Sequence, residues 1–262
     1  MKIIDTHCHL NEDRLYPNRA DIVDRCLKAG VVKVINNGDT MQSWERIALL
    51  AHEFPSVCYS AVGIHPEEDN GDIDGEMKSL EQAILSTPNL VALGEIGLDY
   101  HNDHSPEMKK KQKALFRAQI AMAEKYDLPI IVHSRDADAD TFNTIIDSGF
   151  KGNVTLHCYS GSFQMALRYL RHKKNVYFGI GGVLTFKNAR SLLEVVQRVP
   201  SSQFLLETDS PFLTPVPYRG QLNDPSKTVY VLEKMAELLN RDKEELADEI
   251  YTRSLSVYGI KE

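Results

Sequence analysis

After Met1 and Lys2 the chain reads Ile3-Ile4-Asp5-Thr6-His7-Cys8-His9-Leu10. An apolar pair followed by polar residues predicts a short, buried first strand over residues 3–6 that ends just before the histidines. Side chains two residues apart on a strand point to the same face, so His7 and His9 should project side by side. Two imidazoles fixed together near a strand end suit a divalent metal ion. Ordinary loop or core histidines would give the same local pattern, and ligands from later strands would decide between the two interpretations.

The rest of the chain alternates short apolar runs with longer stretches whose apolar residues recur at helical spacing. Further strands are predicted over residues 31–35, 57–64, 90–96, 128–132, 153–156, 176–180 and 204–207. Helices are predicted over residues 20–29, 41–52, 78–85, 106–126, 138–147, 162–172 and 187–198. The tail, residues 225–258, carries two more helical patterns that are split near Asn240.

Eight strand–helix units in alternation predict an α/β protein with a parallel sheet. The 262 residues match the length of a (β/α)8 TIM-type barrel, about 250 residues. No linker or low-complexity segment divides residues 1–262, so we expect one closed barrel domain. An open, doubly wound sheet is the alternative. Its dinucleotide-binding form is disfavoured, because no G-x-G-x-x-G motif follows the first strand.

Composition and charge reduce the number of functions that the chain could have. The chain has no run of about 18 apolar residues and no signal-peptide pattern at its start, so we expect no membrane association. Its four cysteines form no C-x-x-C pair, which favours free thiols in a reducing cytoplasm. The formal net charge of −7 argues against a protein that holds nucleic acid by a general basic surface. A nuclease with a local, metal-containing phosphate site is still compatible with that charge.

Polar residues of metal-ligand type stand where five of the predicted strands end, the end at which (β/α)8 barrels carry their chemistry. They are His7, His9, Glu95, His133, His157 and Asp209. Six ligands exceed the protein ligands of one zinc ion and fit two ions about 3.5–4 Å apart, with Glu95 as the bridge. Nitrogen and oxygen ligands favour Zn²⁺, Mn²⁺, Co²⁺ or Mg²⁺ without selecting among them.

Taken together, the motifs resemble the TatD family of metal-dependent deoxyribonucleases, a branch of the amidohydrolase-like barrels. The matching stretches are D-T-H-C-H-L (5–10), G-I-H-P (63–66), G-E-I-G-L-D-Y (94–100), V-H-S-R-D-A (132–137), H-C-Y-S-G (157–161), E-T-D-S-P-F-L-T-P (207–215) and R-G-x-x-N-x-P (219–225). One departure lies in the last helix, where many members carry an Asn and this chain has Tyr251-Thr252-Arg253-Ser254. We expect that change to affect a helix-packing contact and not the metal site.

The resemblance implies a barrel-shaped, divalent-metal phosphodiesterase that acts on DNA, often as a 3′→5′ exonuclease. It implies one metal held by His7, His9, Glu95 and Asp209, and a second held by Glu95, His133 and His157. For the hydrolysis we expect Asp209, or as second choice Glu95, to accept the proton of the attacking water. DNA should touch the protein only locally, as a single strand or a strand end at the barrel mouth.

Other residues in the loops at the same end are candidates for phosphate and sugar contacts: His65, Arg135, Lys187, Tyr218 and Arg219. His65 and Arg135 are favoured because they lie inside matching motifs, whereas a single surface Lys or Arg is usually only solvated. Asp99 is a candidate to support a metal ligand by hydrogen bonding. Tyr100 and Tyr159 could stack on a terminal base, and buried packing explains them equally well.

Two other functions compete with the nuclease. An amidohydrolase or lactonase on the same barrel would often use a carboxylated lysine as the metal bridge, but the corresponding strand end offers Glu95 and no lysine. A binding protein that keeps the barrel only as a scaffold would not need the complete ligand set. Turnover of a chromogenic phosphodiester, with and without chelator, would discriminate among the three.

Overall fold

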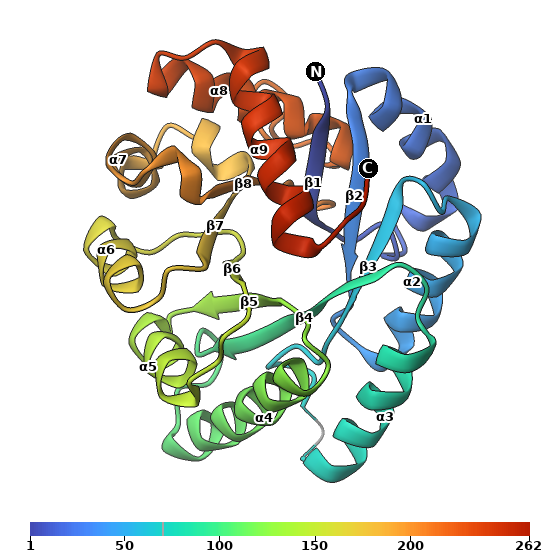
Figure 1. Cartoon of the computed structure of the whole chain (residues 1–262), viewed down its shortest axis with the longest axis vertical. Helices are drawn as coiled ribbons and strands as arrows, with labels where there is room; N and C mark the ends of the chain where they lie inside the picture. Colours follow the sequence, from blue (N-terminus) through green and yellow to red (C-terminus); the bar gives the residue numbers. More distant parts are fainter. Residues whose placement is uncertain (70) are drawn as a thin grey trace.

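The computed structural model describes residues 1–69 and 71–262. In it the chain forms one sheet of eight parallel strands whose order in the sheet is their order in the sequence, surrounded by helices (Figure 1). The strands are β1 (Ile3–Cys8), β2 (Val31–Asn37), β3 (Cys58–Val62), β4 (Leu90–Asp99), β5 (Ile130–Arg135), β6 (Val154–Leu156), β7 (Val176–Ile180) and β8 (Phe204–Leu206).

The sheet closes on itself where the segment after β8 meets β1. A parallel bridge joins Cys8 to Ser210, and the His9 amide donates to the Ser210 carbonyl at 2.8 Å. The Asp209 amide likewise donates to the His7 carbonyl at 2.9 Å. The predicted (β/α)8 TIM-type barrel is thereby confirmed, and the open doubly wound sheet is excluded.

Helices follow the strands around the outside of the barrel (Figure 1). They are α1 (Arg19–Ala29), α2 (Met41–Glu53), α3 (Ile73–Ser86), α4 (Pro106–Lys125), α5 (Asp138–Ser148), α6 (Phe163–His172), α7 (Arg190–Arg198), α8 (Thr228–Leu239) and α9 (Lys243–Tyr258). Short 3-10 turns lie at Tyr16–Asn18, Gly182–Thr185, Ser201–Gln203 and Pro225–Lys227. Among the described helices, none is long and apolar enough to cross a membrane.

Local sequence explains where several helices begin and end. The hydroxyls of Thr40, Ser105 and Ser162 each accept a hydrogen bond from an amide in the first turn of the helix that follows. Gly30 and Asn240 end α1 and α8 in the left-handed conformation. The split of the tail predicted near Asn240 is thus confirmed.

Helices α3 and α7 begin several residues away from the positions that the sequence pattern predicted. Helix α3 begins at Ile73 instead of residue 78, because the Asp72 side chain caps it by accepting from the Gly75 amide. Helix α7 begins at Arg190, so Lys187 lies before the helix and not within it. Strand β4 continues past Ile96 to Asp99, because it keeps pairing with β5, from Gly97 opposite His133 to Asp99 opposite Arg135.

Two apolar clusters fill the molecule. The larger one lies between the strands and the surrounding helices. The smaller one contains Ile4, Ile35, Ala61, Val91, Ala92, Ile131 and Leu205 from the strands, and Tyr251, Val257, Tyr258 and Ile260 from α9 and the segment after it. Residues from six strands can reach one compact cluster only inside the barrel, so this cluster is the interior core, and α9 packs against it.

Helix α9 crosses one end of the barrel, near both chain termini (Figure 1). The Tyr258 hydroxyl bonds to the Thr155 hydroxyl at 2.9 Å inside the protein. The Arg253 guanidinium donates to the carbonyl of Phe204, the first residue of β8, at 2.8 Å. The segment that departs from the family pattern therefore makes a helix-packing contact at the end where the strands begin.

Candidate metal centre

The six predicted ligands come together at the opposite end of the barrel, where the strands finish. His7, Glu95 and His133 lie in β1, β4 and β5, while His157 directly follows β6. His9 and Asp209 follow β1 and β8 by one and three positions. The groups His7–His9–Glu95, His7–His157–Asp209 and Glu95–His133–His157 each offer ligand atoms within 4.8 Å of one another.

The first set of donor atoms faces one oxygen of Glu95. His7 Nε2 lies 3.1 Å from His9 Nε2 and 3.3 Å from Glu95 Oε2. Asp209 Oδ1 completes the set at 3.5 Å from His9 Nε2 and 3.7 Å from His7 Nε2. Two imidazole nitrogens and two carboxylate oxygens converge on one point, which is a ligand set that divalent metals accept.

The second set faces the other oxygen of the same carboxylate. Glu95 Oε1 lies 2.6 Å from His157 Nε2 and 2.8 Å from His133 Nδ1. The two imidazole nitrogens are 3.2 Å apart. Glu95 therefore lies between two donor sets and presents one oxygen to each, which is the arrangement that a bridging carboxylate requires.

Hydrogen bonds on the outer side of two rings decide which nitrogen faces the centre as a ligand. His9 Nδ1 lies 3.0 Å from the Asn37 carbonyl, which can only accept, so Nδ1 carries a proton and Nε2 is the nitrogen that can give its lone pair to a metal ion. His133 Nε2 lies 2.9 Å from Asp99 Oδ2, which makes Nδ1 the nitrogen available to a metal ion by the same argument. Ring nitrogens that converge while an outer acceptor holds the other N–H of the ring fit a metal ion, and Asp99 supports His133 as its position suggested.

The charges of the centre follow from burial and from the neighbours. Burial raises the pKa of Glu95, but the charge of His157 and hydrogen bonds from His133 and His157 outweigh it and hold that pKa well below its usual value. Burial would lower the pKa of His9, but the hydrogen bond to Asp209 and the charge of Glu95 outweigh it and raise that pKa to about 9. Burial lowers the pKa of His7 to about 4. The carboxylates are therefore ionised, and a cation that binds at His9 Nε2 would release the proton that this ring holds at neutral pH.

Two buried carboxyl groups that the sequence analysis did not single out lie beside the centre. Asp5 accepts from the Thr208 amide at 3.0 Å and from the Thr208 hydroxyl at 2.6 Å, and thereby ties β1 to the segment after β8. Glu207 accepts from the Cys158 amide at 2.5 Å. Burial raises the pKa of Asp5 to about 7 and that of Glu207 well above its usual range. Their position inside the D-T-H and E-T-D motifs was the sequence signal that could have identified Asp5 and Glu207.

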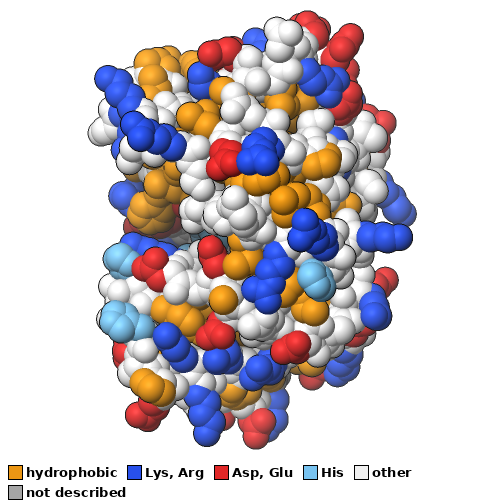
Figure 2. Space-filling view, turned by 90° about the vertical axis from the view of Figure 1, so that its left-hand side faces the viewer, with side chains coloured by type: hydrophobic (Ala, Val, Ile, Leu, Met, Phe, Trp, Pro, Cys, Tyr) orange, Lys and Arg blue, Asp and Glu red, His pale blue; other side chains and the backbone are white. Residues whose placement is uncertain are grey.

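A cavity of about 450 Å³ opens over the centre. It is lined by His9, Glu12, Asp39, His65, Glu67, Glu68, Glu95, Asp99, His133, Arg135, His157, Asp209 and Phe212. Figure 2 shows the molecule hollowed at its left-hand edge, which is the side that faces away from the viewer in Figure 1, with acidic and histidine side chains beside the recess. Among the described lining residues, Arg135 is the one Lys or Arg, so the cavity is acidic.

The predicted substrate contacts divide into two groups. His65 and Arg135 line the cavity, and His65 Nε2 lies 3.8 Å from Glu95 Oε1. Lys187 is exposed ahead of α7, outside the cavity lining. Arg219 is also outside it: its guanidinium lies 3.8 Å from the centre of the Phe186 ring and donates to the Thr214 carbonyl. A substrate contact by Lys187 or Arg219 stays a prediction.

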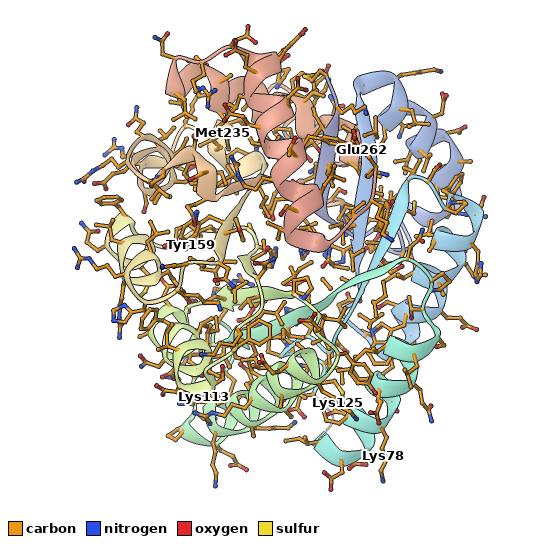
Figure 3. The ribbon with its side chains drawn as sticks, viewed as in Figure 1. Lys78, Lys113, Lys125, Tyr159, Met235 and Glu262 are labelled. Carbon is orange, nitrogen blue, oxygen red and sulfur yellow. The ribbon has the colours of Figure 1, made fainter. Side chains whose placement is uncertain are left out.

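The two tyrosines considered for base stacking are both buried. Tyr100 is 4% exposed and its hydroxyl donates to Asp140 at 2.9 Å. Tyr159 is 6% exposed, packs against Phe178 and lies inside the ribbon in Figure 3. The packing interpretation is therefore correct for both. The aromatic side chain that lines the cavity is Phe212, in the E-T-D-S-P-F motif, which the sequence analysis did not select.

Comparison with known proteins agrees with this arrangement. A sequence model of the family described as "TatD related DNase" matches residues 4–259. The chain belongs to this family. YabD of Bacillus subtilis, named a metal-dependent hydrolase, is 38% identical over 247 residues, which are 94% of each chain. TatD of Mycobacterium tuberculosis, named in the same way, is 32% identical and covers 98% of each chain. The chain is therefore a member of a family of metal-dependent hydrolases.

Solved structures give the same result for the fold. The crystal structure of YjjV, a TatD homologue from Escherichia coli, superimposes with a TM-score of 0.91 at 29% identity and covers 99% of this chain and 98% of its own. The phosphotriesterase homology protein from Escherichia coli, crystallised with phosphate in its active site, has a TM-score of 0.71 at 12% identity, over 98% of each chain. At that identity the likeness concerns the barrel alone.

Proposed function

We propose that this chain hydrolyses DNA phosphodiester bonds with the help of two divalent metal ions, removing nucleotides from a 3′ end. The observation that carries the proposal is the pair of donor sets that share Glu95 at the floor of an open cavity. Dinuclear sites of this kind are typical of enzymes that cleave phosphate esters. The family description points to the same reaction.

The donor atoms define which residues would hold the ions. His7, His9, Glu95 and Asp209 would hold one, and Glu95, His133 and His157 the other. Divalent ions bound there would make water more acidic and stabilise negative charge on phosphoryl oxygens. Zn²⁺, Mn²⁺, Mg²⁺ and Co²⁺ all fit nitrogen and oxygen ligands.

The chain's own side chains supply proton transfer and substrate positioning. Burial raises the pKa of Asp209, but the hydrogen bond from His9 and the charge of His157 outweigh it and hold that pKa below its usual value, so the carboxylate is ionised and can accept the proton of the attacking water. Glu95 is the second choice for this role. The Glu67 amide donates to His65 Nδ1 at 3.3 Å, which leaves the ring proton on Nε2, directed at the centre. His65 can therefore donate to a phosphoryl oxygen, and Arg135 can pair with a phosphate.

The acidic cavity favours contact with a short piece of substrate. Glu12, Asp39, Glu67 and Glu68 line it beyond the donor sets, and each would repel additional phosphates. A long track along the DNA backbone would need a basic groove. A strand end that enters the cavity with one or two phosphates avoids most of this repulsion, which supports exonuclease action on single strands or frayed ends.

We also propose a cytoplasmic location. The four cysteines are free, and three of them are buried. Burial raises the pKa of the Cys58 thiol to about 12 and those of Cys8 and Cys26 further. Buried, protonated thiols without disulfide partners are typical of proteins in reducing compartments.

Digestion of oligonucleotides labelled at the 5′ or the 3′ end, single- and double-stranded, after reconstitution with each metal, tests the proposal. We expect 5′-labelled single strands to give a ladder that shortens with time, and EDTA to prevent it. Excess metal added after EDTA should restore cleavage. Absence of cleavage with all four metals, together with turnover of a lactone or an amide, would instead establish the amidohydrolase or lactonase alternative.

A further inference from the structure

An aromatic side chain is exposed beside the metal centre. Of the eight large hydrophobic side chains that are exposed in the described residues, three lie in the loop after β8: Phe212, Val216 and Leu222. Phe212 is 48% exposed and alone among the three lines the cavity that contains His9, Glu95 and Asp209. Leaving a phenylalanine ring half in water forgoes hydrophobic stabilisation, so its position calls for an explanation.

The backbone of this residue is held firmly. The Phe212 amide donates to the Asp209 carbonyl at 3.0 Å. The buried Asn223 side chain donates to the Phe212 carbonyl at 2.6 Å and to the Thr208 carbonyl at 3.2 Å. These bonds tie the backbone of Phe212 to the segment that carries Asp209, a proposed metal ligand. The backbone that carries the ring is therefore fixed relative to the point where the phosphate would react.

The positively charged side chain of Arg14 lies next to the Phe212 ring. The Arg14 guanidinium lies 4.7 Å from the centre of the Phe212 ring, within the range of a cation–π contact. Arg14 is held in turn by Glu12, whose carboxylate lies 2.8 Å away and lines the same cavity. An aromatic face next to a guanidinium plane is the kind of surface on which proteins stack exposed nucleobases.

We propose that Phe212, accompanied by Arg14, stacks on the nucleobase adjacent to the scissile phosphate. This inference rests on the proposed hydrolysis of DNA and identifies a substrate-binding residue for it. Stacking also explains how an acidic cavity can hold a nucleotide with few cationic contacts, because every base offers a π face regardless of charge. The binding energy would come from stacking of the base on Phe212 and from contact of the phosphate with the metal centre. Such stacking would not favour a particular base.

The test compares two single-stranded oligonucleotides, one that ends in thymidine and one that ends in an abasic tetrahydrofuran nucleotide. Loss of stacking on one base costs about 1–3 kcal/mol, or roughly 5- to 150-fold. Phe212→Ala should therefore lower the ratio of kcat/KM for the thymidine end to that for the abasic end by about 5-fold or more. Phe212→Leu should also lower it, and Phe212→Trp should keep it near the wild-type value.

Val216→Ala is the matched control, because Val216 is exposed in the same loop but does not line the cavity. It should leave the ratio unchanged. Circular dichroism and metal content show whether each variant is folded and loaded. A second readout avoids turnover: a phosphorothioate oligonucleotide with terminal 2-aminopurine should lose fluorescence on binding to metal-loaded wild-type protein, and should lose little with Phe212→Leu.

The outcomes separate this inference from the proposal on which it rests. If the wild type cleaves DNA but Phe212→Ala and Phe212→Leu slow both oligonucleotides equally, Phe212 only shapes the loop and stacking is refuted. Unchanged ratios in both variants refute it as well. If the wild type neither cleaves nor binds either oligonucleotide with any metal, the proposed function itself fails, and base stacking fails with it.

Discussion

The two ends of the barrel interior differ in composition although the same strands form both. Ile35, Ile131 and Leu205 belong to the interior apolar core, which α9 covers. Two residues further along the same strands or just past them stand Asn37, His133 and Glu207. Because side chains two apart on a strand share a face, each pair points to the same side, about 7 Å apart along the strand.

This difference suggests that one end of the barrel interior serves the stability of the fold and the other end serves its chemistry. The apolar layer gains free energy by removing its side chains from water. The polar layer instead places carboxylates and histidines together, where burial of a charge is costly unless an opposite charge compensates it. Substitutions at the mouth should therefore affect metal binding and turnover, and substitutions at the α9 end should affect unfolding.

The largest effect is expected for Glu95→Gln, which keeps the shape of the side chain but removes the charge between the two donor sets. We expect kcat/KM to fall by about 100- to 1000-fold or more, as on loss of one preorganised electrostatic group. The melting temperature should also no longer rise on addition of Mn²⁺, because stabilisation by a ligand requires binding. Enzyme assays, metal analysis and thermal unfolding measure the three quantities.

Glu81→Gln is the control for that substitution, because Glu81 pairs with Lys125 on the surface. It should change neither turnover nor the shift caused by Mn²⁺. Near-normal turnover of Glu95→Gln at saturating metal would show that Glu95 does not bridge two ions.

A smaller effect is expected for Asp99→Asn. Asp99 fixes the ring of His133 through a 2.9 Å hydrogen bond to Nε2, and loss of such a supporting contact typically weakens metal binding by about 10- to 100-fold. Activity should return at high metal concentration, since the donor atoms remain. Titration of metal-free protein with Mn²⁺, followed by activity and calorimetry, measures the shift. Asp136→Asn, on the surface beside His101, should bind metal normally, and equal affinity in both variants would contradict the role of Asp99.

The convergence of the six candidate ligands could be predicted from sequence because of where the apolar runs stop. Parallel strands of a barrel finish at one end, so a polar residue after each apolar run is directed to the same place. His133 and His157 are 24 positions apart, yet their ring nitrogens lie 3.2 Å apart. Each apolar run predicts a strand, and the polar residue after it marks where that strand ends. Closure of the barrel then brings these strand ends together.

Other features could not be predicted, because they depend on contacts between distant segments. The tail was predicted to be two helices, but amphipathic spacing does not show that α9 packs across the barrel interior. The extension of β4 depends on Gly97, whose φ is 149° and where an added Cβ would lie 2.0 Å from the His133 carbonyl oxygen. Phe212 looked like an ordinary apolar residue, and only the fold shows that its ring is exposed at the cavity.

At the opposite end, Tyr258→Phe should lower stability without affecting chemistry. The substitution removes the buried hydrogen bond to the Thr155 hydroxyl, which contributes about 0.5–1.5 kcal/mol. Urea unfolding of metal-free protein should show a loss of that size, while kcat and metal affinity stay at wild-type values. Tyr230→Phe, which loses only a partly exposed bond to Tyr218, should lose less. A fall in kcat for Tyr258→Phe would mean that the two ends are coupled.

The smallest effect concerns salt. The net charge of −7 and the acidic lining of the cavity should confine favourable contacts with phosphate to the centre, His65 and Arg135. Each neutralised phosphate of a single strand contributes about −0.7 to the slope of log affinity against log salt. Contact with one or two phosphates therefore predicts a slope of about −1 to −2, measured with metal-loaded protein and a phosphorothioate oligonucleotide. Arg135→Ala should reduce the slope by about one contact without loss of metal.

Lys243 distinguishes a local contact from a general loss of charge, because it begins α9 and pairs with Glu233 outside the cavity lining. Lys243→Ala removes the same charge as Arg135→Ala but should leave the slope unchanged. Metal-free protein should bind the oligonucleotide far more weakly, since the two proposed divalent ions would bring four positive charges to the mouth. A steep slope, or equal binding without metal, would mean that DNA also follows a surface outside the cavity, and the contrast between the two ends would then not describe how the substrate is held.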